Sequence, residues 1–195
     1  MKYTLFIFLL ITALASTSCV NLKPRPDSTK LYTLGPVPAL ANAVSAEKSK
    51  AVYVARPNLP LFLNGNQLKY RLSDGELKRL SAARWAEALD EGIARAMAEF
   101  LSASSPTVSV SGYYPWPYLS ADLPKLNLHF HQFAAHDDGS VHLEVDWQLR
   151  RTGGASVSGR FTATSLRWSK NKASSLVSAL NEGLKQLSDE IAGSL

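Results

Sequence analysis

The 195-residue sequence is poor in cysteine, in long apolar runs and in clustered charge. Its one cysteine, Cys19, excludes an intramolecular disulfide. No run approaches the roughly 20 apolar residues that a membrane-spanning helix requires. The basic residues are scattered along the chain, whereas nucleic-acid binding needs them gathered in a stripe or patch. The sequence also lacks the G-x-S-x-G, Walker and G-x-G-x-x-G motifs. We therefore expect no nucleic-acid partner, no cofactor and no catalytic residue.

The first residues have the three parts of a secretory signal. Lys2 is the only charge before Lys23, an apolar run covers residues 3–15, and small residues follow. A buried N-terminal helix would not need this order of parts. We predict that residues 1–18 are a signal peptide and that the exported chain has a net charge of +4, one less than the +5 of the full sequence, because Lys2 is removed.

Cys19 directly follows the signal, and a thiol there is explained by acylation, with palmitate-type chains anchoring the protein to a membrane. Val20 replaces the aspartate associated with retention on the inner membrane, so we expect the outer membrane, with the domain on its periplasmic face. The position three before the cysteine usually carries a branched aliphatic residue, but here it is Ser16. Cleavage after Ala15 would instead give a soluble periplasmic or secreted protein.

The rest of the chain predicts one domain after a tether. Residues 19–30 are polar with two prolines, as expected of a lipidated tether, and residues 31–195 form a single periplasmic domain. Strands are expected at 31–34, 51–55, 107–110 and 157–164. The alternation of residues 126–130 and 141–149 around Asp138 and Gly139 indicates an antiparallel hairpin.

Residues 67–82 allow two interpretations. Ser73 and Glu76 have the spacing of a capping box that would start a helix, whereas Asp74 and Gly75 are a strong hairpin signal. We favour the hairpin. Apolar residues at three- and four-residue spacing then predict amphipathic helices over about 83–102 and 173–192. The predicted fold is α+β, a mainly antiparallel sheet with both helices packed on one face.

The histidines are the only group of residues that suggests catalysis. His129 and His131 share a strand face, and His131 is expected opposite His142 or Glu144, with Asp146 nearby. A metal site is geometrically conceivable there, so a secreted or anchored metal-dependent enzyme is the alternative function. The spacing matches no metalloenzyme motif, and a solvated polar face explains the same residues.

Residues 113–118 hold four aromatic residues and two prolines. Tyr and Trp are enriched in protein contacts, so Tyr114, Trp116 and Tyr118 are candidates for partner contact. Trp116 could equally fill the edge of the core.

Several segments together resemble the ABC-type transport auxiliary lipoproteins (PqiC/YmbA type) of paraquat-inducible and related MCE transport systems. The resemblance covers nearly the whole mature chain. Its most specific part is R-W-A-E-x-L at a helix start, here Arg84, Trp85, Glu87 and Leu89, for which a structural role is expected. The other matching segments are Tyr32 to Leu34, Leu59 to Leu63, Gln67, Leu68, Arg71, Pro115 with Trp116, Phe133, and Leu143 with Trp147.

The resemblance implies a non-catalytic adaptor on the outer membrane. Such a protein would dock an MCE-domain protein and its inner-membrane transport components, with a homo-oligomeric ring as one arrangement. A lipid carrier with its own apolar cavity is a third possibility. Cargo and transport direction are not implied.

Overall fold

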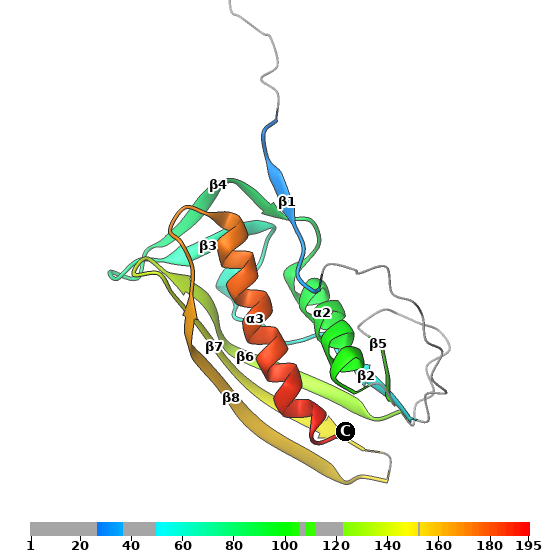
Figure 1. Ribbon diagram of the computed structural model, residues 1–195. Coiled ribbons are helices and arrows are strands. Elements are labelled where there is room, and N and C mark those ends of the chain that lie inside the picture. The colour runs from blue at the N-terminus through cyan, green and yellow to red at the C-terminus, as the bar shows by residue number, and fades with distance from the viewer. Residues whose placement is uncertain (1–26, 37–49, 106–107, 112–122, 152) are drawn as a thin grey trace, which may run out of the picture.

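The computed structural model describes residues 27–36, 50–105, 108–111, 123–151 and 153–195 (Figure 1). The signal peptide, Cys19, most of the tether, and Tyr114, Trp116 and Tyr118 lie outside the described residues. The described chain forms eight strands, a short 3-10 helix and two α-helices. In chain order they are β1 (Lys30–Tyr32), β2 (Lys50–Val54), η1 (Leu61–Leu63), β3 (Gln67–Arg71), β4 (Leu77–Trp85), α2 (Leu89–Ser104), β5 (Val108–Ser111), β6 (Lys125–His136), β7 (Ser140–Arg150), β8 (Ser156–Arg167) and α3 (Ala173–Ala192).

The strands form one mixed sheet, not the mainly antiparallel sheet expected from the sequence. Six of the strands follow the order β1-β4-β3-β6-β2-β5. The remaining two continue the sheet from β6, which also pairs with β7, and β7 in turn pairs with β8. The pairs β3–β4, β6–β7 and β7–β8 are antiparallel, whereas β1–β4, β2–β5, β2–β6 and β3–β6 are parallel. Alternation reports which face a residue takes but not the direction of the neighbouring strand, so the parallel pairs could not be foreseen.

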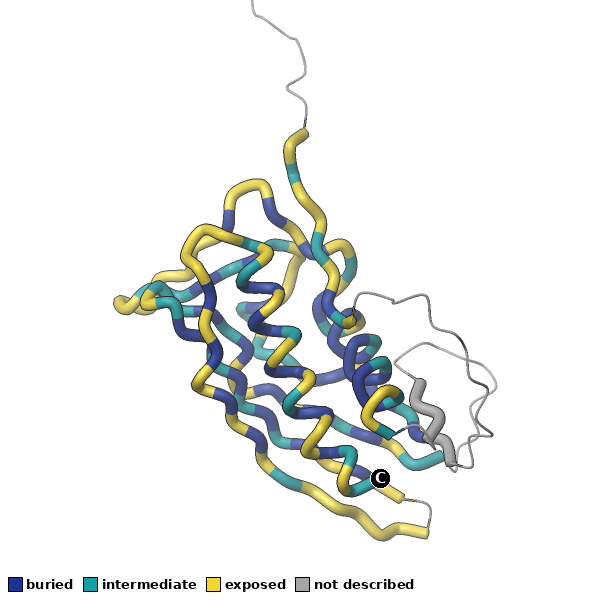
Figure 2. The backbone as a smooth tube through the Cα atoms, viewed as in Figure 1, coloured by how far each residue is buried: buried dark blue, intermediate teal, exposed yellow. Residues whose placement is uncertain are grey.

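The two helices lie side by side in front of the sheet (Figure 1). On α3, Leu176, Leu180, Leu184, Leu187 and Ile191 recur every three or four residues and are buried, which confirms the predicted helix over 173–192. The buried stripe of α3 faces the sheet and its opposite side is exposed, whereas α2 is buried over most of its surface (Figure 2). The core therefore lies between this helix pair and the strands.

The hairpin preferred for residues 67–82 is confirmed, because β3 and β4 pair antiparallel around Asp74 and Gly75. The predicted helix start near residue 83 is wrong, since β4 continues to Trp85 and α2 begins at Leu89. The amides explain this. Trp85 N–H donates to Asn66 O at 2.7 Å and Ala86 N–H to Tyr32 O at 2.9 Å, so they bond to neighbouring chain segments and not to a helical turn.

Candidate functional site: the N-terminal clamp and the motif groove

The N-terminal segment is fixed to the domain by a short strand and a buried leucine. β1 pairs in parallel with the end of β4, with Tyr32 opposite Trp85. Two residues later Leu34 is only 3% exposed. The first described residues, which follow the tether, are therefore integral to the fold.

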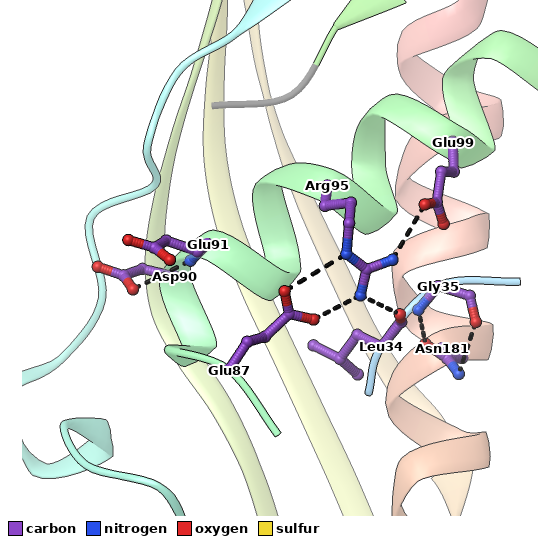
Figure 3. A network of polar contacts seen from close by, with 8 residues as sticks. All are labelled: Leu34, Gly35, Glu87, Asp90, Glu91, Arg95, Glu99 and Asn181. Carbon is purple, nitrogen blue, oxygen red and sulfur yellow. Dashed lines mark hydrogen bonds and ion pairs between the residues drawn. The ribbon is translucent and has the colours of Figure 1, made fainter. Parts of the chain in front are cut away.

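Arg95 of α2 holds this segment from one side. Its Nη2 donates to the backbone oxygen of Leu34 at 2.8 Å and also to Glu87, while its Nη1 donates to Glu99 at 3.0 Å (Figure 3). One guanidinium thus joins two carboxylates to the backbone of the N-terminal segment. We call Arg95, Glu87, Glu99 and Asn181 the N-terminal clamp.

Asn181 of α3 holds the same segment from the other side. Its Oδ1 accepts a hydrogen bond from the Gly35 N–H at 2.9 Å, and its Nδ2 donates to the Gly35 oxygen at 3.4 Å (Figure 3). The side-chain amide therefore satisfies both polar groups of one backbone residue. Since Arg95 and Asn181 come from different helices, the N-terminal segment is tied to both.

The charges of the clamp reinforce one another. The hydrogen bonds that Arg95 donates to Glu87 are the largest cause of the raised pKa of Arg95; burial opposes this effect, and the hydrogen bond to Glu99 adds to it. Arg95 is consequently a cation at every relevant pH. Gly92 leaves room for the arrangement, because a Cβ there would lie 3.2 Å from Glu87 Oε1.

Beside the clamp lies a groove of about 600 Å³ between the η1 region and the β4–α2 connection. We call it the motif groove, because two of the segments that resemble the family, Leu59 to Leu63 and Arg84 to Leu89, meet there. Its apolar lining includes Leu59, Leu63, Trp85 and Leu89. The charged side chains along it are Glu87 and the ion pair of Arg56 with Asp90.

The structure places the four signature residues in different roles. Trp85 and Leu89 are both 7% exposed, but Trp85 ends β4 and only Leu89 belongs to α2. Glu87 precedes the helix and pairs with Arg95, whereas Arg84 is an exposed residue of β4. The residue before the helix, Ala88, makes no side-chain cap.

Sequence reasoning missed Arg95, Glu99, Asn181 and Gly35. The two charged residues sit on the polar side of α2, where surface solvation explains them equally well. Gly35 gave a weak signal, a glycine directly after an apolar strand. Nothing in the sequence indicated that it meets a helix residue 146 positions away.

The histidines do not form the cluster considered for a metal. His131 Nε2 lies 2.7 Å from Asp146 Oδ2, as the expected proximity implied, but His142 pairs with Ala134 and its ring lies 4.6 Å from that of His136. The strand register explains the separation, because Phe130 lies opposite Val145 and Gln132 opposite Glu144, which leaves His142 further along β7 from His131. Among the described residues no three His, Cys, Asp or Glu side chains are grouped as metal ligands.

Asp146 is instead the acceptor of a surface ion-pair network. Hydrogen bonds from Arg160, at 2.6 and 2.9 Å, and from His131 hold the pKa of Asp146 well below its usual range. Because the carboxylate is already neutralised by Arg160, this network fits the solvated polar face.

An enclosed space under Trp85 and Leu180 measures about 20 Å³. This is room for about one water molecule and is far too small for an acyl chain. The described interior therefore gives the lipid-carrier interpretation no support at this position.

Comparison with known proteins decides the family. The family model for ABC-type transport auxiliary lipoprotein components matches residues 32–192. The chain belongs to this family. None of the curated proteins compared with it has a significantly similar sequence. The family is defined as an auxiliary transport component and not as an enzyme, and its lipoprotein character indicates a membrane-anchored place in the cell envelope.

Solved structures share the fold of this auxiliary lipoprotein. One, described as an uncharacterized protein, has a TM-score of 0.68 and 25% identity and covers 85% of this chain and 98% of its own. A Xanthomonas campestris protein of the DUF330 family has a TM-score of 0.64 and 18% identity and covers 85% and 94%. In the described part of the auxiliary lipoprotein, no helix combines the length and apolarity needed to cross a membrane.

Proposed function

We propose that this auxiliary lipoprotein is an adaptor, anchored to the outer membrane through an acylated Cys19, that docks an MCE-domain protein of an ABC-associated lipid transport system. The N-terminal clamp carries the proposal. If the protein is anchored at its N-terminus, the anchor can position the folded domain only if the N-terminal segment is fixed to that domain. The clamp provides this connection, because it ties Leu34 and Gly35 to both helices.

The motif groove is the proposed contact for the MCE-domain protein. Interface cores combine apolar side chains with aromatic residues, and charged groups surround them. The groove has this composition, with Trp85 and three leucines between charged residues. Leu61, between the groove residues Leu59 and Leu63, is 83% exposed and adds an apolar side chain at this edge.

Co-purification tests the adaptor function. The protein is tagged at its C-terminus in its native cell, membranes are solubilised in mild detergent, and captured proteins are identified by mass spectrometry. We expect an MCE-domain protein and a transport subunit to be enriched at least about tenfold over an unrelated lipoprotein. Capture of neither would overturn the proposal.

Paired variants test the groove. Leu61→Lys introduces a charge at the groove edge, and Val157→Lys makes the same kind of change on β8, where Val157 is 37% exposed. We expect the first variant to lower recovery of the MCE-domain protein at least about tenfold and the second to leave it within about twofold. Equal recovery of the MCE-domain protein with both variants would show that the groove is not part of the interface.

We further propose that several copies assemble around the docked protein as a ring. Native mass spectrometry of the detergent-solubilised protein would then show a defined oligomer. A monomer at all concentrations, with the MCE-domain protein still captured, would reject the ring while leaving the adaptor role intact.

A further inference from the structure

One end of the molecule carries six exposed basic side chains. The residues before β1 enter the domain at this end, where β4 and the β8–α3 connection also lie (Figure 1). Many residues of the chain there are exposed (Figure 2). We call the following exposed residues the basic end: Lys30, Lys78, Arg79, Arg84, Lys170 and Lys172.

Packing brings these residues together from three parts of the sequence. Lys30 lies opposite Ala83 in the β1–β4 pair, next to Arg84. Lys78 lies opposite Tyr70 in the β3–β4 pair. The ring centroid of Trp168 lies 5.3 Å from that of Tyr70, which fixes the β8–α3 connection beside the same strands. The scattered basic residues of the sequence thus share one end in the fold.

The basic end is not neutralised by ion pairs within the described chain. None of its six members makes an ion pair with another described residue, whereas Arg56, Arg95, Arg160 and Lys185 all do. Its acidic neighbours are Asp27 before β1, whose pKa is lowered mainly by hydrogen bonds from Thr29 and also by Arg84, Asp74 and Glu76 in the β3–β4 turn, and Asp137 and Asp138 in the β6–β7 turn, which hydrogen-bonds to Trp168. Six basic side chains thus stand beside five acidic ones, and none of the six is held in an ion pair within the described residues. These charges are available to an external anionic partner.

We propose that the basic end lies against the anionic phospholipid headgroups of the membrane that holds the protein. The tether joins the domain at this end, so an anchored domain presents this surface to the bilayer at short range. Each basic residue near an anionic bilayer strengthens binding about fivefold, and the effect fades beyond a Debye length. Lipid contact therefore fixes the orientation of the domain relative to the bilayer. The proposal rests on the anchor of the proposed function.

Lysine labelling tests the orientation in the intact protein. The lipidated protein is reconstituted into phosphatidylcholine vesicles with or without about 30% phosphatidylglycerol, and amine acetylation is followed by mass spectrometry. We expect labelling of Lys78, Lys170 and Lys172 to slow at least about threefold only in anionic vesicles at low salt, and to recover in about 0.5 M salt. Lys125, at the far end of β6, should label equally in both. Equal labelling of all four lysines in both vesicles would overturn the proposal.

Charge reversal tests the same surface without the anchor. In the full chain carrying Cys19→Ser, Lys78→Glu with Lys170→Glu should weaken binding to anionic vesicles at least about 25-fold. The control, Lys125→Glu with Arg150→Glu, makes the same charge change at the other end of the molecule and should stay within about twofold. Equal losses in the two pairs would overturn the proposal, as would protection of the basic end only upon addition of a protein partner.

The two arms separate this inference from the proposed anchor. If the wild-type protein failed to float with neutral vesicles, the proposed lipid anchor would be rejected. Binding of the Cys19→Ser chain to anionic vesicles would still test the basic end.

Discussion

At the scale of single residues, Gly35 shows how closely the N-terminal segment is fitted to the helices. Its φ of +102° is a conformation that favours glycine. A Cβ there would lie 2.5 Å from Glu99 Oε2 and 3.1 Å from Arg95 Nη1. The residue is therefore constrained both by its backbone and by the clamp around it.

Gly35→Ala should lower the free energy of unfolding by more than the cost of placing an alanine at a positive φ. The positive φ costs about 1–2 kcal/mol, and displacement of Glu99 from Arg95 adds to it. Gly65→Ala is the matched control, since Gly65 has a φ of +97° and a Cβ there would have no neighbouring atom within 4 Å. Urea unfolding of both variants measures the difference, and equal losses would show that the clamp tolerates the methyl group.

His136 should make stability depend on pH. Its burial is the largest cause of a lowered pKa, and the neighbouring His142 adds to it. Its Nε2 is buried and has no hydrogen-bond partner among the residues that the structure describes. The unfolded chain binds this proton near pH 6.5, whereas the folded protein binds it only at lower pH, so acidification through this interval favours unfolding.

We therefore expect the free energy of unfolding to fall as the pH decreases from about 7 to about 5, and to fall less in His136→Gln. Denaturant titrations at several pH values measure both slopes. Parallel slopes for the two proteins would assign the pH dependence to other groups.

At the scale of elements, α3 rests directly on the sheet at Gly183. A Cβ at this position would lie 2.6 Å from Leu143 Cδ2 and 2.8 Å from Leu166 Cδ1, on β7 and β8. The glycine allows close approach of the helix to the strands, even though it weakens the helix by about 1 kcal/mol relative to alanine.

Gly183→Ala should destabilise the protein, because overpacking costs about 1–3 kcal/mol and exceeds the gain in helix propensity. Gly193→Ala should be neutral or slightly stabilising, since Gly193 has a φ of −64° and its nearest neighbouring atom lies 3.7 Å from the position of an added Cβ. The melting temperatures of the two variants, measured by thermal unfolding, separate the effect of close packing from the effect of helix propensity. A stabilised Gly183→Ala protein would mean that α3 shifts freely.

The elements also show what the sequence can and cannot predict. The stripe of α3 and the alternation of β6 and β7 depend on local burial, so both were correctly predicted. The start of α2 was not, because Trp85 and Leu89 are four residues apart and both buried, as on a helix, although one belongs to a strand. Ala88 supplies none of the capping residues that would mark the boundary. The clamp depends on contacts across 61 and 146 residues, which no local pattern records.

At the scale of the whole molecule, the proposed acylation of Cys19 is what would hold the protein on the membrane. Cys19→Ser should move the protein from the membrane fraction to the soluble periplasmic fraction, because the acyl chains that hold it on the bilayer are absent. Fractionation with immunoblotting measures the distribution, and metabolic labelling with a palmitate analogue gives the direct control. Wild-type protein already in the soluble fraction would favour cleavage after Ala15.

The clamp also determines how the domain responds to mechanical load. A pull through the tether reaches β1 first, then Leu34 and Gly35, where bonds to β4, α2 and α3 share the load. Because these bonds follow one another along one short segment, the pairing of β1 with β4 has to break before the load falls fully on Leu34 and Gly35. A displacement of the N-terminal segment would therefore move β4 and both helices with it, as one rigid body.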